Sequence, residues 1–252
     1  MFAEERYREI RQIVREKRRV AFADLQRKVK VSAATLRRDL AELERAGEVI
    51  RVHGGVLDPG YVRTEISFDD RVLRNAAEKR ALAARAAGLP EPGMSVFVDA
   101  GTTCLEAGRI LLGRSDIRVV THSVALLAEA QHCAADVLCI GGELRKISGA
   151  LVGGNTLNAL GSIKVDMALI GATGLDADGA YTTELSEAEI KRTIIARSAR
   201  TVLLCDSSKW GRASTVHFAQ WKNFDLWITD RALASAASKG IRAQGVTIRH
   251  GL

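Results

Sequence analysis

Residues 31–47 read Val-Ser-Ala-Ala-Thr-Leu-Arg-Arg-Asp-Leu-Ala-Glu-Leu-Glu-Arg-Ala-Gly, and this stretch decides how the first part of the chain folds. Ser32 is a favourable N-cap residue, and Gly47 suits the position just past a helix end. Three leucines recur at helical spacing and predict one buried face: Leu36, Leu40 and Leu43. The stretch therefore predicts a helix whose other faces carry Arg37 and Arg38.

The neighbouring segments predict a small domain around this helix. Apolar residues at helical spacing indicate a first helix over residues 4–17, and Phe22–Val29 predicts a second, short one. Lys30 and Val31 form the turn before the third helix. Residues 48–55 then predict a β-hairpin arm that ends in a Gly-Gly turn. Three helices and a β wing make a winged helix-turn-helix over residues 1–57.

The third helix has the residues that a DNA-reading helix needs. Its first turn is small and polar, which permits close approach to base edges in the major groove: Ser32, Ala33, Ala34 and Thr35. The Thr35 hydroxyl can donate a hydrogen bond, and its methyl group can contact thymine. Arg37 and Arg38 diverge around the helix, so one can address guanine while the other binds phosphate. The alternative is an ordinary amphipathic helix whose arginines are solvated.

Charge is concentrated in the same segment. Residues 1–57 carry 14 lysines and arginines against 9 aspartates and glutamates, whereas the other 195 residues carry 23 against 21. A short segment with most of the excess positive charge suits a polyanion such as nucleic acid. A solvated basic surface is the alternative.

The rest of the chain alternates strand and helix patterns. Residues 58–80 predict a linker that begins at Pro59 and a connecting helix over 67–80, and residues 81–252 predict an α/β domain. Seven runs have strand character: Met94–Val98, Ile117–Val120, Val137–Ile140, Val165–Ile170, Thr201–Cys205, Asp225–Thr229 and Val246–Arg249. Four helical patterns lie between them: Cys104–Leu112, Val124–Gln131, Ser186–Ala199 and Arg231–Lys239. This alternation predicts a mainly parallel sheet with helices on both faces.

Polar residues and glycines follow the predicted strands. In an open parallel sheet, ligands bind beyond the carboxyl ends of the strands, where helix N-termini and hydroxyls attract anions. We expect a sugar phosphate to bind there, at Asp99, Gly101, Thr102, Thr103, Thr121, His122, Ser123, Gly141, Gly142, Gly171, Gly174, Glu184, Asp206 and Lys209. Each residue alone has a plainer explanation: threonines cap helices, aspartates bind backbone amides, and a lone lysine lies on the surface.

Several classes of protein are excluded. No run approaches the ~20 apolar residues of a membrane span, and the acidic residues Glu4 and Glu5 do not fit a signal peptide. Four cysteines are scattered without paired spacing (Cys104, Cys133, Cys139 and Cys205), and three of them fall within apolar runs, which predicts buried free thiols in a reducing cytoplasm. Neither they nor the five histidines show metal-ligand spacing, so we expect no metal and no cofactor.

The first 57 residues resemble the N-terminal domain of the DeoR family of bacterial regulators. That family has a helix of the form VS-x-x-TIRRDL followed by an R-x-HGG wing, which Val31–Leu40 and Arg51–Gly55 match. Leu36 stands where isoleucine is usual. The resemblance implies that Arg37 and Arg38 contact the operator, with Arg51 and His53 near the DNA backbone or minor groove. A turn residue that bonds local backbone is the alternative for His53.

The second part resembles the sensor domain of the same family. Asp99-x-Gly-Thr-Thr, the pair Gly141-Gly142, Asp166 before Gly171-x-x-Gly174, and Asp206-x-Ser-Lys stand in the family's order. The resemblance implies a fold similar to ribose-5-phosphate isomerase and a phosphorylated sugar as effector. One departure is Thr121-His122-Ser123, where the family often has Thr-Asn-Ser. His122 can change which hydroxyls are read or add pH sensitivity.

Three functions remain open at this stage. The first is a regulator, most simply a repressor of sugar catabolism genes, that binds operator DNA as a homo-oligomer (a dimer or tetramer) and is released by a phosphorylated sugar. The second is a sugar phosphate isomerase, with Asp99, Glu184, Glu187 and Asp206 as acids or bases and Lys191 and Lys209 as electrophiles. No tight acid–lysine constellation is visible, so we expect no enzyme activity. The third is a DNA-binding protein without a ligand response.

Overall fold

The computed structural model describes residues 3–17, 19–52, 54–59, 67–212 and 214–250. The chain divides into two compact units, Met1–Arg74 and Asn75–Leu252. Each unit has its own hydrophobic core.

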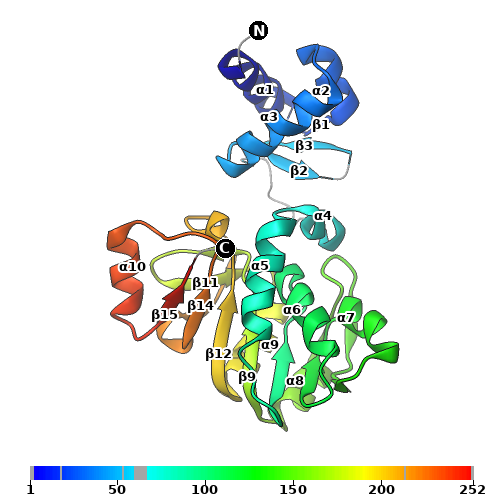
Figure 1. Ribbon diagram of the computed structural model, residues 1–252, viewed down its shortest axis with the longest axis vertical. Helices are drawn as coiled ribbons and strands as arrows, with labels where there is room; N and C mark the ends of the chain where they lie inside the picture. The colour runs from blue at the N-terminus through cyan, green and yellow to red at the C-terminus, as the bar shows by residue number, and fades with distance from the viewer. Residues whose placement is uncertain (1–2, 18, 53, 60–66, 213, 251–252) are drawn as a thin grey trace. The chain divides into compact units, whose positions relative to one another are not determined.

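The first unit consists of helices around a small antiparallel sheet (Figure 1). Its helices are α1 (Ala3–Lys17), α2 (Phe22–Val29), α3 (Ala33–Arg45) and α4 (Phe68–Leu73), and its strands are β1 (Arg19–Ala21), β2 (Ile50–Val52) and β3 (Gly55–Leu57). The strand order is β1-β3-β2. The predicted winged helix-turn-helix is therefore confirmed, with one strand more than the hairpin arm that we expected.

Helix α3 begins and ends as its sequence predicts. The Ser32 hydroxyl accepts a hydrogen bond from the Thr35 backbone N–H at 3.1 Å, and Gly47 adopts a positive φ of 74° just past the helix end. The three predicted leucines are buried in the core of the unit. Arg6 of α1 donates two hydrogen bonds, of 2.8 and 3.0 Å, to the buried carboxylate of Asp39. This ion pair ties α1 to α3 beside the leucine core.

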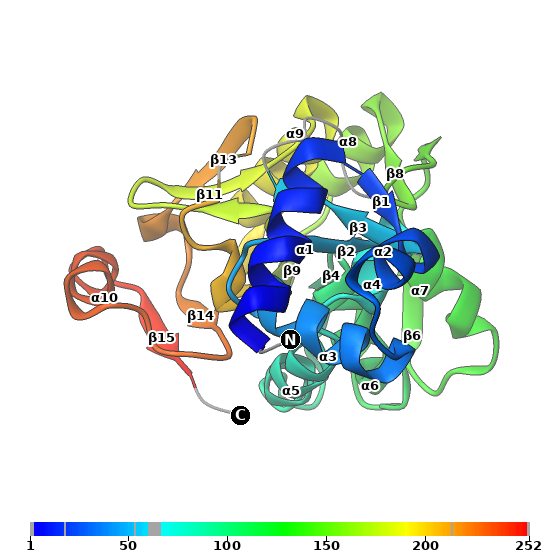
Figure 2. The ribbon, with the colours of Figure 1, turned by 90° about the horizontal axis from the view of Figure 1, so that it is seen from above.

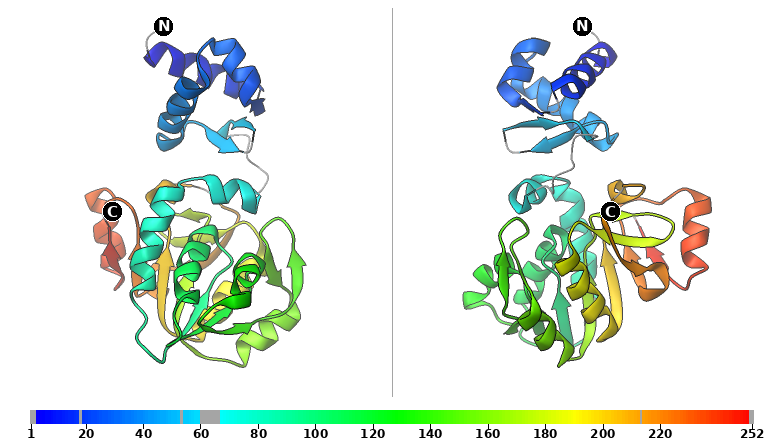
Figure 3. Two further views of the ribbon diagram at one scale, coloured as in Figure 1. Left: turned by 45° about the vertical axis from the view of Figure 1, so that its right-hand side comes forward. Right: turned by 180° about the vertical axis from the view of Figure 1, so that it is seen from behind.

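The second unit is built on a seven-stranded parallel sheet (Figures 1 and 3). All seven predicted strands are present in it: β4 (Ser95–Val98), β5 (Arg118–Thr121), β6 (Asp136–Cys139), β9 (Val165–Ile170), β12 (Ser198–Leu204), β14 (Leu226–Ile228) and β15 (Thr247–Arg249). Their spatial order is β15-β14-β12-β9-β4-β5-β6, and every neighbouring pair is parallel. The carboxyl ends of the strands therefore meet at one edge.

Helices cover both faces of this sheet (Figure 3). They are α5 (Ala76–Ala87), α6 (Thr102–Leu112), α7 (Val124–Glu129), α8 (Gly154–Gly161), α9 (Leu185–Ala196) and α10 (Ser235–Arg242). Helices α5 and α6 pack against each other, as do α8 and α9. Helix α9 ends earlier than its pattern predicts, because β12 begins at Ser198.

Short antiparallel pieces were not predicted. Strands β7 (Glu143–Arg145) and β8 (Ala150–Val152) form a hairpin, and β10 (Gly174–Leu175), β11 (Gly179–Thr182) and β13 (Val216–Gln220) form a three-stranded sheet. Three 3₁₀ turns accompany them: Ala130–His132, Ser207–Lys209 and Trp221–Asn223. Figure 2 shows the β11–β13 sheet and the α10–β15 segment as separate parts of the second unit. Most of these segments mix polar residues or glycine with apolar ones, so they lack the short apolar run that marks the strands of the parallel sheet.

The predicted connecting helix over residues 67–80 is wrong in form. Two helices replace it, because Asn75 adopts a left-handed conformation (φ 49°, ψ 40°) between α4 and α5. Asparagine tolerates this conformation better than most residues. The border between the two units lies immediately before Asn75.

Among the described residues, none of the helices has the length and apolar character that a membrane span requires.

We predict that the two cores can be destabilised separately. Leu36 is fully buried in the first unit, so Leu36→Ala is expected to lower that unit's free energy of unfolding by ~2–5 kcal/mol. All three tryptophans lie in the second unit. In a urea titration, Leu36→Ala will therefore shift the first loss of helical circular dichroism but leave the tryptophan fluorescence transition in place.

The matched control is Leu111→Ala, which truncates a fully buried leucine of α6 and is expected to move the fluorescence transition. Equal shifts of both signals in both variants would show instead that the two units unfold as one.

Candidate functional site

The outer side of α3 presents two arginines. Arg37 and Arg38 are exposed, as is Ala34 one turn earlier, while Thr35 is half-buried. The Arg37 guanidinium lies over the Phe22 ring, with its carbon 5.4 Å from the ring centroid. Arg38 lies almost opposite the leucine face. The first turn of helix α3 thus consists of small residues, and two cationic side chains follow it.

Six other arginines in the described part of this unit are paired with carboxylates: Arg6, Arg11, Arg27, Arg45, Arg51 and Arg74. Four of these pairs join different segments, at N–O distances of 2.8 Å for Arg6–Asp39, 2.6 Å for Arg11–Glu48, 3.1 Å for Arg51–Glu44 and 3.3 Å for Arg74–Glu44. Within the described residues, neither Arg37 nor Arg38 forms an ion pair. Their charge is therefore available to a phosphate or a base edge.

The wing, formed by β2 and β3, contributes less clearly to a DNA-binding surface than α3 does. Arg51 lies in β2, its side chain is 37% exposed, and its Nε is held by Glu44. A pocket of about 260 Å³ lies beside it, lined in part by Arg37, Arg51 and Gly54. His53, which we predicted to lie near the DNA, is outside the described residues.

In the second unit, the predicted effector residues lie at the carboxyl ends of the strands. Asp99–Thr103 follow β4, Thr121–Ser123 end and follow β5, and Gly141 and Gly142 follow β6. Gly171 and Gly174 follow β9, and Asp206–Lys209 follow β12. Because these strands are parallel, all five loops share one edge of the sheet.

At the centre of this edge is a buried ion pair. Asp99 and Lys191 of α9 are both buried, and the Lys191 ammonium donates hydrogen bonds to the Asp99 carboxylate and, at 3.1 Å, to the Gly171 carbonyl. The Gly171 N–H donates to the same carboxylate at 2.9 Å. The sequence did not reveal this acid–lysine pair, although both residues had been considered separately as candidates. Asp99 and Lys191 are 92 positions apart, and only the fold brings them together.

The pair changes the proton affinities of both groups. Burial alone would raise the pKa of the Asp99 carboxyl, but Lys191 and His122 hold that pKa well below its usual range. Burial alone would lower the pKa of Lys191, but Asp99 and Glu187 raise it. Both groups are therefore charged at neutral pH.

His122 lies on the other side of Asp99. Its Nδ1 is 2.9 Å from the Leu151 carbonyl oxygen, so it donates there, and its ring stacks on Phe97. Its Nε2 is 3.3 Å from both the Ala100 N–H and an Asp99 oxygen. A neutral ring accepts from Ala100, whereas a protonated ring donates to Asp99.

The hydroxyl groups at this edge of the sheet differ in whether they are available to bind a ligand. Thr121 Oγ1 donates to the Val98 carbonyl at 2.7 Å, and Ser123 Oγ caps helix α7, so both serve the backbone. Thr102 and Thr103, in the first turn of α6, form no side-chain hydrogen bond within the described part of the chain. They and the N-terminal amides of α6 are the donors that an anion could use.

A second polar group lies at the end of β12. The buried carboxylate of Asp206 accepts hydrogen bonds from the Ser208 N–H at 3.1 Å and from the Ser208 hydroxyl. Asn75 Nδ2 donates to the same oxygen at 3.1 Å and to Ser208 Oγ at 3.3 Å. Burial would raise the pKa of Asp206, but the charge of Lys209 and the Ser208 hydroxyl keep it below its usual range.

A third group gathers around Arg145 of β7. Its guanidinium lies 2.9 Å from Glu187 and 3.5 Å from the predicted residue Glu184. Glu187 and Lys191 are four positions apart on α9, a spacing that could have revealed them together. Arg145 and Asn75 were missed as site residues, because their segments carried no signal of a site.

Asp166 does not belong to this edge. It is exposed near the beginning of β9, and its carboxylate accepts hydrogen bonds from Ser95 N–H at 2.8 Å and Ser95 Oγ at 2.7 Å. These bonds join the amino ends of β4 and β9, opposite the effector edge. Asp166 therefore joins β4 to β9 at their amino ends and lies away from the effector edge.

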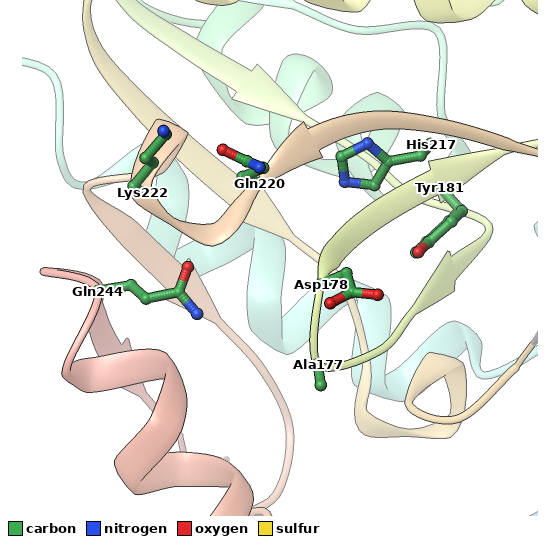
Figure 4. Close-up of a pocket in the computed structure, with 7 residues that line it drawn as sticks. All are labelled: Ala177, Asp178, Tyr181, His217, Gln220, Lys222 and Gln244. Atoms are coloured by element: carbon green, nitrogen blue, oxygen red, sulfur yellow. The ribbon is translucent and has the colours of Figure 1, made fainter.

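A pocket of about 460 Å³ lies elsewhere in the second unit (Figure 4). It is lined by Ala177, Asp178, Tyr181, His217, Gln220, Lys222 and Gln244. None of the predicted effector residues lines it. Over the described residues, no group of three or more histidines, cysteines, aspartates or glutamates could hold a metal ion.

Family models match both units. The DeoR-like helix-turn-helix domain matches residues 6–59, and the DeoR C terminal sensor domain matches residues 74–231. The chain is 35% identical to the HTH-type transcriptional regulator GlpR of Haloferax volcanii, over 100% of this chain and 99% of that protein. It is 31% identical to the glycerol-3-phosphate regulon repressor of Escherichia coli, over 90% of each.

Solved structures show partial likenesses. Ribose 5-phosphate isomerase A of Methanocaldococcus jannaschii aligns with a TM-score of 0.40 and 17% identity, over 54% of this chain and 55% of that one. The translation initiation factor eIF-2B of Pyrococcus horikoshii aligns with a TM-score of 0.47 and 14% identity, over 89% and 86%.

Two adjoining family models thus cover the helix-turn-helix and the sensor unit in the order that the structure has them. The relatives that match over nearly the whole length are transcriptional regulators. The chain belongs to the DeoR family of transcriptional regulators.

Proposed function

We propose that this chain is a cytoplasmic repressor that binds a two-fold symmetric operator as a homo-oligomer and is released by a phosphorylated sugar or polyol. The observation that carries the proposal is the polar edge of the sensor sheet. It combines helix N-terminal amides, two threonine hydroxyls and Lys209, which are the groups that bind a phosphate. The relative from Escherichia coli named above is a repressor of a glycerol-3-phosphate regulon, which agrees with a small phosphorylated effector.

Operator binding is assigned to the outer side of α3. Its small first turn would approach the bases, and Arg37 and Arg38 would meet base edges and phosphates. Helices that read symmetric half-sites need two copies of the unit, which supports a dimer or a larger even assembly.

Release of the operator requires that the effector bind the DNA-free form of the protein more tightly than the DNA-bound form. An effector that favours the unbound form by about 2.7 kcal/mol weakens operator binding about a hundredfold.

The buried cluster favours a sensor over an isomerase. An isomerase needs a carboxylate that can take a proton from carbon, and such a base works best when its pKa is near the working pH. Asp99 has one oxygen engaged by Gly171 and Lys191 and the other 3.3 Å from His122 Nε2, and its pKa lies far below neutrality. We therefore propose that the cluster shapes the site without turning over the ligand.

The direct test of the proposal is fluorescence anisotropy. Labelled DNA from upstream of the chain's own gene is titrated with the protein, and then with sn-glycerol 3-phosphate, D-ribose 5-phosphate, D-fructose 6-phosphate and the matching compounds without phosphate. Release by a phosphorylated compound alone is expected. Binding that no compound reverses would contradict the sensor, and no specific binding would contradict the repressor.

For the operator, we predict different roles for the two arginines. Arg38 points furthest from the core and has no ion pair, so Arg38→Ala is expected to cost ~1–3 kcal/mol of specific binding and to relax the base preference. Arg37 is held beside Phe22, so Arg37→Ala is expected to weaken binding to all sequences and to reduce the salt slope by about one. Anisotropy on operator and scrambled DNA at several salt concentrations measures both.

Arg85→Ala is the control, because it removes one exposed arginine from α5 in the other unit. If Arg38→Ala and Arg85→Ala bind the operator equally well, α3 does not read it through Arg38.

For the effector, we predict that Lys209→Ala abolishes release but leaves operator affinity unchanged, because the residue lies at the sensor edge and not in the first unit. Lys239→Ala in α10 is the matched control, with the same change in charge on an exposed side chain. Retention of wild-type release by Lys209→Ala would remove this loop from the effector site.

For the buried cluster, we predict that Lys191→Met destabilises the second unit by ~3–5 kcal/mol, because it leaves Asp99 buried without a counter-charge. Without Lys191, burial raises the Asp99 pKa, so the folded variant binds a proton at higher pH than wild type. The difference in the free energy of unfolding between wild type and Lys191→Met will therefore become smaller as the pH falls from 8 to 5. Urea unfolding followed by tryptophan fluorescence measures this.

The double variant Asp99→Asn with Lys191→Met separates charge from shape. It removes both charges and is expected to recover part of the loss at pH 8. A pH-independent loss in Lys191→Met that the double variant does not reduce would show that packing, not the ion pair, is what Lys191 provides.

A further inference from the structure

Two consecutive residues stand at the border between the units, and each is anchored to a different functional element. Arg74 is the last residue of the first unit, and Asn75 is the first residue of the second. One peptide bond joins them, which fixes their Cα atoms about 3.8 Å apart.

Arg74 is anchored to the recognition helix. Its Nε lies 3.3 Å from a carboxylate oxygen of Glu44, in the last turn of α3, and both side chains are buried. The same carboxylate accepts a hydrogen bond from the Arg51 N–H of β2 at 3.1 Å. Glu44 therefore joins the end of α3, the wing and the last residue before the border.

Asn75 is anchored to the predicted effector loop. It occupies the N-cap position of α5, yet its side chain does not cap that helix. An asparagine cap is ordinarily worth ~1 kcal/mol, so this side chain forgoes a favourable local bond. Its amide instead donates to Asp206 at 3.1 Å and to Ser208 at 3.3 Å. Its left-handed backbone is a further local cost that the surrounding structure sustains.

The loop that Asn75 binds is the one assigned to the effector. Asp206 is buried, and one oxygen receives the Asn75 amide, the Ser208 N–H and the Ser208 hydroxyl. Lys209, in the same 3₁₀ turn, supplies the largest favourable charge, ahead of Lys79 and Arg212. A phosphate bound by Lys209 and Ser208 takes donors and charge away from Asp206, so it changes the acceptor that holds Asn75.

We propose that Arg74 and Asn75 are the positioning residues that couple effector binding to operator release. Effector binding would weaken or redirect the Asn75–Asp206 bond, shift the start of α5, and so displace Arg74 from Glu44 at the end of α3. This inference rests on the proposed function. It adds the route by which the sensor loop acts on the recognition helix.

The test measures a coupling factor in the full-length protein. That factor is the ratio between operator affinity without effector and operator affinity with the phosphorylated compound that releases wild type. Asn75→Ala removes the amide. Asn75→Gly also removes it but favours the left-handed backbone, so the two variants separate the side chain from backbone strain. Arg74→Ala removes the other anchor without touching the sensor loop.

We expect each of the three variants to lower the coupling factor at least tenfold, which corresponds to about 1.4 kcal/mol. Effector affinity of the DNA-free protein, measured by calorimetry, is expected to stay within about threefold for Arg74→Ala, so its loss of coupling cannot come from lost binding. Asn158→Ala, an exposed asparagine of α8, is the matched control and is expected to retain the wild-type factor.

The outcomes separate the two levels of the proposal. Wild-type release combined with unchanged coupling in Asn75→Ala, Asn75→Gly and Arg74→Ala would overturn the coupling route and leave the proposed function standing. Loss in Asn75→Ala but full coupling in Asn75→Gly and Arg74→Ala would also overturn it, since the anchoring side chains would not matter. A wild-type protein that no phosphorylated compound releases would overturn the proposed function and the route with it.

Discussion

The ion pair between Asp99 and Lys191 fixes the centre of the sensor unit. It joins the end of β4 to helix α9, and the Gly171 amide and carbonyl add the end of β9 to the same cluster. Removing two charges from water costs several kcal/mol for each, so such a pair persists only where further hydrogen bonds satisfy both groups. Here His122, Gly171 and Glu187 supply those bonds and charges. The loops that follow β4, β5 and β9 are therefore held in one arrangement before any ligand arrives.

The two polar groups at the sheet edge differ in how firmly they are built. Asp99 faces a buried ammonium, whose charge no neutral donor can replace. Asp206 combines the charges of Lys209, Lys79 and Arg212 with hydrogen bonds from two neutral residues, Ser208 and Asn75. Hydrogen bonds of this kind contribute ~1 kcal/mol each and can be exchanged for bonds to a ligand. The Asp99 cluster is therefore suited to holding the loops in a fixed arrangement, and the Asp206 cluster to changing its contacts when a ligand binds.

The sequence allowed the seven strands of the parallel sheet to be predicted, because strands buried on both faces are short apolar runs between turn residues. The capped helix α3 was also predictable, since Ser32, the leucines and Gly47 agree on its bounds. The Asp99–Lys191 pair was not, because its members lie far apart in the chain and only the parallel order of β4 and β9 brings them together. Nor was the break at Asn75, a residue whose side chain is engaged by Asp206, 131 positions away. Local patterns predict elements, whereas long-range hydrogen bonds decide where some of them stop.

Charge pairing divides the arginines of the first unit by role. Arg6, Arg51 and Arg74 face carboxylates of α3, so their charges hold the domain together and are largely cancelled toward solvent. Arg37 and Arg38 come from the same helix but lie on its outer side, without such partners among the residues described. A polyanion is attracted to uncancelled charge, and the small side chains of the first turn let it approach. The acidic residues of α3 therefore do two things at once: Asp39 and Glu44 fasten the helix to its own unit, and they offset the charges of the inner arginines, whereas Arg37 and Arg38 keep theirs at the outer side of the helix.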